Sequence, residues 1–260
     1  MRTRLSRLVI VVAIVGIGAT APAQTLNFYL KKAQAYVRAR NYERAVEMLK
    51  KGLALQPDNI DVYYNIGIVA MKGKLWSDAL LAYQGYLAVD PKGADRKKVL
   101  ADLKMLKQKK LRDRAATLTV VSHVAKTEFY LDHALIGQAP KLSITLFPGT
   151  YTLRSKKSDF QTVTRTVTLK AGQNETLTID PTEITYYGFL EIVTEPAKGV
   201  TVYLDKKKVG VTPLAKIKLV AKKKVLVVFE AAGYDKWMRY VVIPKNATHT
   251  LKAKLLRPGE

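Results

Sequence analysis

A 34-residue period near the start of this chain constrains its fold more than any other feature. Five positions return at that period without a gap: Tyr42, Ala45, Leu49, Leu53 and Pro57 are followed by Trp76, Ala79, Tyr83, Leu87 and Pro91. A period of this length indicates paired helices that stack on one another. Stacked helical units commonly present a surface to another protein, so the repeat favours a binding or scaffold role.

Small residues and prolines within the repeat indicate how each unit folds. Ala45 and Ala79 have little bulk, so two helices can approach closely at these positions. Pro57 and Pro91 are expected to end the second helix of each pair, because proline lacks the amide donor and clashes with the preceding turn. This pattern resembles the tetratricopeptide repeat (TPR) family. The two copies span residues 26–59 and 60–93.

A further helical stretch, residues 94–114, follows the two repeats. Its apolar residues recur at helical spacing, at Val99, Leu103, Leu106 and Leu111. Stacked units need about three copies or a cap for stability. We therefore expect this stretch to cap the repeats and to join them to the rest of the chain.

The resemblance to TPR proteins implies a concave groove lined by the first helix of each pair. Carried over by position, the candidate partner-binding residues are Lys31, Gln34, Arg38, Tyr64, Asn65 and Lys72. Asn65 stands where the family often has an asparagine that hydrogen-bonds the backbone of a bound peptide. The alternative is that these side chains simply face solvent on the inner helices.

From Thr117 onward, the helical period gives way to the alternation of apolar and polar residues that is typical of short antiparallel strands. The pattern occurs twice. Tyr130, Leu131, Asp132, Gly137, Pro140 and Ile144 match Tyr203, Leu204, Asp205, Gly210, Pro213 and Ile217 at a shift of 73. Phe160 and Leu169 match Tyr234 and Ile243 at a shift of 74. The chain thus contains two copies of one β module.

The second copy carries a series of turn motifs. They are Glu195-Pro196-Ala197-Lys198-Gly199, Val209-Gly210-Val211-Thr212-Pro213 and Ala232-Gly233-Tyr234. This series resembles the PEGA family, whose members are small β-sandwich modules of prokaryotic surface and envelope proteins. The first copy keeps Pro148-Gly149-Thr150-Tyr151 but has Asp159-Phe160 in place of the Gly-Tyr pair.

We therefore expect a multidomain α plus β protein, with N-terminal TPR hairpins followed by two small antiparallel β-sandwich, PEGA-like modules. The expected boundaries are 24–114 for the helical domain, 115–183 for the first β module and 187–257 for the second.

The first residues are typical of an export signal. Arg2, Arg4 and Arg7 precede an apolar run from Leu8 to Gly18, and Ala21-Pro22-Ala23 supplies a small-x-small cleavage pattern. The run is shorter than the roughly 20 apolar residues that span a bilayer. We expect residues 1–23 to be a signal peptide cleaved after Ala23, which would place the protein in a bacterial periplasm or cell envelope. The alternative is an uncleaved N-terminal membrane anchor.

The formal net charge of +23 favours anionic partners. Two lysine clusters occupy predicted turns of the second β module, Lys206, Lys207, Lys208 and Lys222, Lys223, Lys224. They are candidate contacts to an acidic glycan or an anionic lipid surface; the alternative is that they only keep the protein soluble. Nucleic acid is not expected, because the export signal directs the chain out of the cytoplasm and no known recognition motif is present.

Residues that could carry catalysis are sparse and scattered. The sequence has no cysteine, and its three histidines do not have metal-ligand spacing. It lacks a phosphate-binding loop, a dinucleotide fingerprint and a nucleophile elbow. We therefore expect no enzyme activity, no cofactor and no metal.

These observations predict a non-catalytic, exported envelope scaffold or adaptor. Its TPR groove would bind a protein or peptide partner, and its PEGA modules would act as spacers or surface-assembly domains. The alternative is a basic envelope protein that binds a glycan or lipid surface.

Overall fold

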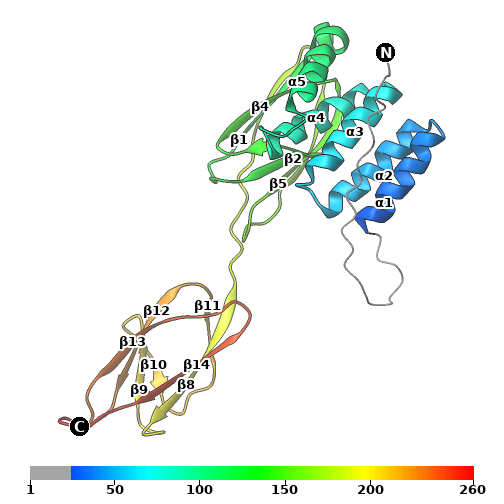
Figure 1. Cartoon of the computed structure of the whole chain (residues 1–260). Helices are drawn as coiled ribbons and strands as arrows, with labels where there is room; N and C mark the ends of the chain where they lie inside the picture. The colour runs from blue at the N-terminus through cyan, green and yellow to red at the C-terminus, as the bar shows by residue number, and fades with distance from the viewer. Residues whose placement is uncertain (1–24) are drawn as a thin grey trace. The chain divides into compact units, whose positions relative to one another are not determined.

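The computed structural model describes residues 25–260, so the predicted export signal lies outside the described residues. These residues form two compact units, one ending at Thr182 and the other spanning Glu183–Glu260. Five α-helices and seven strands belong to the first unit, and seven further strands form the second (Figure 1). The predicted fold class, TPR hairpins followed by two small β modules, is confirmed.

The helices follow the 34-residue period of the sequence. They are α1 (Leu26–Arg38), α2 (Tyr42–Leu55), α3 (Ile60–Gly73), α4 (Trp76–Val89) and α5 (Arg96–Met105), extended by the short turns η1 (Leu106–Leu111) and η2 (Arg112–Arg114). Thr25, Asn41 and Asn59 begin the first three helices by accepting a hydrogen bond from the backbone N–H three residues later. Pro57 and Pro91 lie just beyond the ends of α2 and α4, as their missing amide donors predict.

Helices α3 and α4 interlock through two glycine–tyrosine pairs. The Tyr83 ring of α4 lies against Gly67 of α3, and the Tyr63 ring of α3 lies against Gly85 of α4. A Cβ atom at either glycine would overlap the facing ring. Both tyrosines are fully buried, so the rings have little room to move away. The glycines therefore set how closely this helical pair approaches.

We predict that Gly67→Ala destabilises the first unit. Alanine favours an isolated helix by about 1 kcal/mol over glycine. Overpacking against the buried Tyr83 ring should cost about 1–3 kcal/mol and outweigh that gain. Urea unfolding followed by circular dichroism at 222 nm measures the sign. An increase in the free energy of unfolding would show that the ring can yield and that the close approach is not required.

Each β module is built from two small sheets with the same strand order. The first contains β1 (Ala116–Val121), β2 (Glu128–Leu131), β3 (Ala134–Gln138), β4 (Lys141–Leu146), β5 (Gly149–Lys156), β6 (Thr164–Leu169) and β7 (Asn174–Thr178), ordered β4-β1-β7 and β3-β2-β5-β6. The second contains β8 (Tyr187–Glu195), β9 (Thr201–Leu204), β10 (Lys207–Val211), β11 (Ile217–Val220), β12 (Lys224–Glu230), β13 (Trp237–Val242) and β14 (Thr248–Lys254), ordered β11-β8-β14 and β10-β9-β12-β13.

The pairing of the strands is antiparallel except at one place in each module. Strand β7 runs parallel to β1, and β14 runs parallel to β8. Alternation along a strand identifies its buried face but not the direction of its neighbour, so the sequence did not predict these parallel pairs. The register repeats as well, since Tyr151 opposite Val167 corresponds to Val225 opposite Val241 at the shift of 74.

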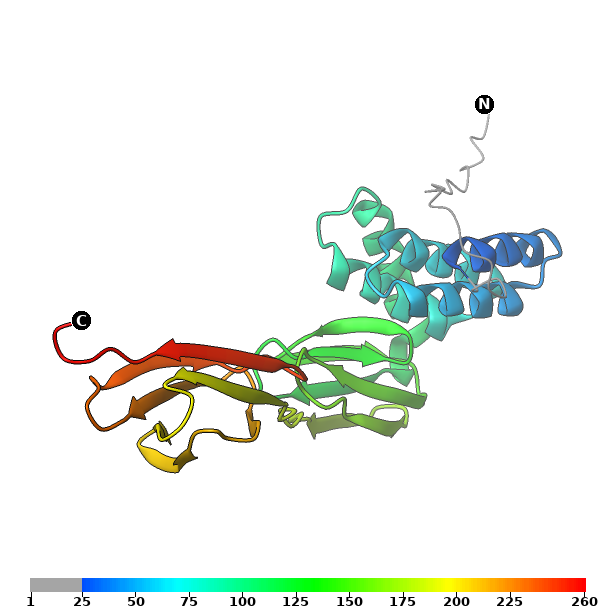
Figure 2. The same ribbon diagram turned by 90° about the horizontal axis from the view of Figure 1, so that it is seen from below.

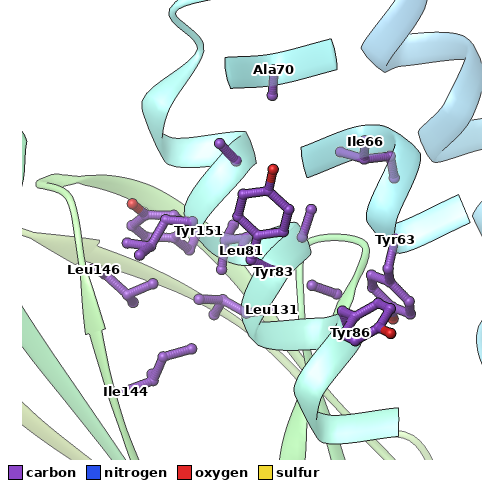
Figure 3. Packing of buried hydrophobic residues seen from close by; sticks show 14 of the residues in the cluster. Tyr63, Ile66, Ala70, Leu81, Tyr83, Tyr86, Leu131, Ile144, Leu146 and Tyr151 are labelled. Atoms are coloured by element: carbon purple, nitrogen blue, oxygen red, sulfur yellow. The ribbon is translucent and has the colours of Figure 1, made fainter. Parts of the chain in front are cut away.

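Helix α4 packs against β3 and β4, the edge strands of the two sheets of the first module (Figure 2). One continuous hydrophobic cluster therefore joins helix residues such as Leu81 and Tyr83 to strand residues such as Leu131 and Leu146 (Figure 3). The structure thus unites in one compact unit two segments that the sequence presents as consecutive domains.

Three polar contacts join the helices to the strands of the first module. The backbone N–H of Leu135 donates to the Tyr63 hydroxyl over 2.9 Å, and that hydroxyl donates to the Pro57 carbonyl over 3.1 Å. Gln84 Nε2 donates to the Thr145 carbonyl over 3.2 Å. The hydroxyls of Ser77 and Tyr151 lie 3.2 Å apart. Burial, the largest cause, raises the pKa of Tyr63 to about 12 and keeps its hydroxyl a neutral donor.

The corresponding edge of the second module has no helix against it within its compact unit. At the shift of 73, the buried residues Ala134 and Leu135 of β3 correspond to the exposed residues Lys207 and Lys208 of β10. Charged side chains on an edge strand discourage pairing with another strand. Lys207 and Lys208 therefore occupy the positions that correspond to the β3 residues covered by α4 in the first module.

We predict that exchanging these residues has opposite consequences in the two modules. Leu135→Lys places an ammonium group against α4 and should cost about 2–4 kcal/mol of unfolding free energy. The reciprocal Lys208→Leu should change stability by no more than about 0.5 kcal/mol, because the position is exposed. Chemical unfolding of both variants tests this. Equal and small effects would mean that the helix–strand contact contributes little.

Candidate functional site

A groove of about 600 Å³ lies on the helical part of the first unit. Its lining comes mainly from α1, α3 and α5. The lining residues are Leu30, Ala33, Gln34, Val37, Arg38, Leu49, Tyr64, Asn65, Ile68, Val69, Met71, Lys72, Lys98 and Asp102. The first helix of each pair, α1 and α3, therefore contributes to one surface. Helix α5, which follows the second pair, occupies the place that the first helix of a third pair would have.

Most residues singled out from the sequence meet in this groove. Gln34 and Arg38 lie four positions apart on α1, and Tyr64, Asn65 and Lys72 lie on α3. Lys31 is exposed on α1 and is not among the lining residues. The geometry places these side chains together, and their role in binding a partner remains a prediction.

The groove combines three kinds of surface. Leu30, Val37, Ile68 and Met71 provide apolar contact area. The carboxamides of Gln34 and Asn65 can each donate and accept hydrogen bonds, as an extended peptide backbone requires. Arg38 and Lys72 stand in the last turns of α1 and α3 and bring positive charge to the groove.

The sequence reasoning missed the contribution of α5. Asp102 Oδ2 accepts a hydrogen bond from the Tyr83 hydroxyl at 2.8 Å and lies 2.7 Å from Lys98 Nζ. The Asp102 side chain is only 16% exposed, so its carboxylate is largely occupied by these two partners. Burial, the largest cause, and this carboxylate raise the pKa of Tyr83.

A signal for these two residues does exist in the sequence. Lys98 follows Tyr64 by one full repeat period, and Asp102 follows Ile68 by the same period. Extending the period once more would therefore have placed both in the groove, although the residue types themselves do not repeat.

Tyr64 forms part of the groove wall between α3 and α5. Its ring lies 6.1 Å from that of Tyr86, centroid to centroid, and it is partly buried. Burial, the largest cause, and the nearby Asp95 carboxylate raise the pKa of Tyr64. Its hydroxyl therefore stays protonated at neutral pH, with the Asp95 carboxylate as its acceptor.

The two lysine clusters of the second module converge at one end of it. Lys206 lies in the β9–β10 turn, and Lys222 and Lys223 lie in the turn between β11 and β12. The backbone of Asp205 pairs with Leu226 near the start of β12, which brings the two turns close together. Their binding to an acidic glycan or an anionic lipid surface remains a prediction.

A second, wider hollow of about 680 Å³ lies between α4, α5 and the β3–β4 edge of the first module. It contains Lys104 and Lys107 together with Gln84, Ile136 and Thr145.

Across residues 25–260, no group of three or more His, Asp or Glu side chains is placed to hold a metal ion. Within the same residues, no helix combines the length and apolar character needed to cross a bilayer.

Comparison with protein families supports both resemblances. The PEGA domain model matches residues 115–183 and 188–258, together more than half of the chain. The TPR repeat model matches residues 27–73. The predicted combination of a TPR segment with tandem PEGA domains is thereby confirmed. A search of the curated proteins finds no match.

Several solved structures show partial likeness. The Bacillus anthracis TIE protein is 13% identical with a TM-score of 0.35, and the match covers 55% of this chain and 34% of that protein. The Arabidopsis OM64 TPR domain is 16% identical with a TM-score of 0.29, covering 33% and 68%. GBS52, a minor pilin of Streptococcus agalactiae, is 12% identical with a TM-score of 0.26, covering 55% and 96%. The chain thus spans about a third of the length of the Bacillus anthracis protein.

Proposed function

Because the chain belongs to the PEGA domain family and carries a TPR repeat before its two PEGA domains, we propose that it is an exported, non-catalytic scaffold that holds a segment of a partner protein in its helical groove. Both families are generally non-catalytic, and TPR domains generally bind proteins. One observation carries the proposal: α1, α3 and α5 together line one groove with apolar, amide and cationic side chains.

The charge of the groove favours a partner segment that contains an acidic residue. Asp102 is already engaged by Lys98 and Tyr83. Arg38 and Lys72 form no ion pair within the described residues. A carboxylate from the partner would supply the missing counter-charge, and an arginine can hold it through two parallel hydrogen bonds.

The remaining lining suits an extended peptide. The amides of Gln34 and Asn65 can satisfy donors and acceptors of a peptide backbone, while Leu30 and Ile68 offer contact area to one apolar side chain of the partner. We infer a short linear segment that combines an apolar and an acidic residue.

The PEGA modules then serve to position the groove. The first is packed against α4 and supports the helices directly. The second forms its own compact unit, which suits a spacer or a module that attaches to an envelope assembly. The envelope location rests on the predicted signal peptide of residues 1–23.

A peptide selection tests the groove. Peptides selected from a phage-displayed random library on the full chain should share an apolar and an acidic residue. Asn65→Ala and Arg38→Gln should each weaken the binding of a selected peptide about tenfold, since a hydrogen bond to a charged group contributes about 1.5–3 kcal/mol and a neutral one about 1.

The matched control is Lys31→Gln, which removes the same charge from α1 as Arg38→Gln but lies outside the lining. Peptide affinity should change less than about twofold in this variant. Equal losses for Lys31→Gln and Arg38→Gln would show that net charge, rather than the groove, drives binding. Selected peptides that ignore both Asn65 and Arg38 would contradict the proposal.

A further inference from the structure

One end of the second PEGA domain gathers basic side chains from three neighbouring segments. We call the group Lys206, Lys222, Lys223, Lys224 and Lys245 the lysine end. Backbone hydrogen bonds hold the segments together: Asp205 N–H donates to the Leu226 carbonyl, and Lys222 N–H donates to the Ile243 carbonyl, both over 2.9 Å. All five lysines are exposed.

Lysines outnumber carboxylates in these segments. Across residues 205–206, 221–224 and 244–247 the sequence places the five lysines beside a single acidic residue, Asp205. Asp205 accepts a hydrogen bond from Leu226 N–H at 2.9 Å, so its carboxylate is directed at the sheet. Lys206, Lys223 and Lys224 alone outnumber this carboxylate, so the lysine end carries net positive charge and a positive potential.

Aromatic rings accompany the lysines. The ammonium nitrogen of Lys245 lies 3.3 Å from the ring centroid of Tyr186, and that of Lys224 lies 4.4 Å from the ring centroid of Tyr240. Tyr187 and Tyr240 are 45% and 57% exposed. Val242, beside Tyr240 on β13, is 54% exposed. Tyr187 lies on β8 and Tyr240 on β13, so exposed rings accompany the lysines on both sheets of the domain.

The first PEGA domain shows that the fold does not require these residues. Tyr240 of β13 pairs with Leu226, and its counterpart at the shift of 74 is Thr166, which pairs with Thr152. Val242 corresponds in the same way to Thr168. The two copies share strand order and register, so the exposed aromatic and apolar residues are particular to the second copy.

We propose that the lysine end docks on the surface of a membrane that contains anionic phospholipids. Ammonium groups attract lipid phosphates. Tyrosine is favoured where an apolar region meets a polar one, because its ring and its hydroxyl suit opposite sides of that boundary. A stacked sugar fits less well, since an ammonium group already covers one face of the Tyr186 and Tyr240 rings. This role is additional to partner binding and does not depend on the groove.

Vesicle sedimentation of the full chain tests the proposal. Binding is measured on phosphatidylcholine vesicles and on vesicles that also contain phosphatidylglycerol. The triple variant Lys206→Gln, Lys223→Gln, Lys224→Gln should lower partitioning onto the anionic vesicles by at least tenfold, because each lysine near such a surface contributes about fivefold. Raised salt should weaken the wild-type binding.

The matched control removes three lysines from the opposite end of the same domain: Lys198→Gln, Lys252→Gln, Lys254→Gln. These residues are exposed, and Lys254 pairs with Glu195 at the far end of β8. The control has the same net charge as the first triple variant and keeps the same residues 1–24. Its partitioning onto the anionic vesicles should stay within about twofold of that of the wild type. Equal losses in the two triple variants, or no preference for anionic vesicles, would overturn the proposal.

A second pair of variants separates a lipid surface from a soluble polyanion. Tyr240→Thr introduces the small polar residue that the first copy carries opposite Thr152, and Tyr187→Thr makes the same change at the other exposed ring. They should weaken vesicle binding severalfold, because the rings would lose their interfacial contact, and should leave binding to heparin unchanged. Unchanged vesicle binding together with equally tight heparin binding would identify an acidic glycan as the ligand and contradict the lipid proposal.

Discussion

The packing of helix α4 on the β3–β4 edge of the first PEGA domain is the contact on which the rest of the first unit depends. It covers two edge strands that would otherwise expose apolar residues such as Leu135. It also buries Tyr63, whose hydroxyl links the loop before α3 to β3. Because α3 forms a wall of the groove, the β module holds this candidate site in place as well as extending the chain.

The same edge has opposite character in the two PEGA domains. In the first it is apolar and covered by a helix; in the second, Lys207 and Lys208 are exposed. The duplication thus supplies an internal comparison between two copies of one fold. Residues that both copies keep, such as Gly137 and Gly210, belong to the module itself. Residues that differ at this edge match what lies against each copy: the helices contact Leu135 in the first, and solvent surrounds Lys208 in the second.

Much of the fold could be predicted from the sequence because the helical hairpin and the β module each occur twice. The 34-residue period predicted hairpins at 26–59 and 60–93, and the shifts of 73 and 74 predicted a duplicated β module. The structure adds that the strand register repeats as well. Contacts between elements were less accessible. Leu135 alternates like any core residue of a strand, so nothing local shows that a helix covers it.

The candidate site was predicted to a similar extent. Gln34, Arg38, Tyr64, Asn65 and Lys72 line one groove, whereas Lys31 does not. Asp102 was missed because its partner Tyr83 belongs to a different helix, and only the fold brings them within 2.8 Å. The convergence of the two lysine clusters likewise depends on strand pairing between β9 and β12, which residue spacing alone does not reveal.

Hydrogen exchange followed by mass spectrometry along a denaturant series tests most directly whether the helices and the first PEGA domain form one cooperative unit. The account predicts that helices α3 and α4 lose protection at the same denaturant concentration as strands β2 to β5. Strands β8 to β14 should lose theirs in a separate transition. Loss of protection in the helices while β2 to β5 stay protected would contradict it.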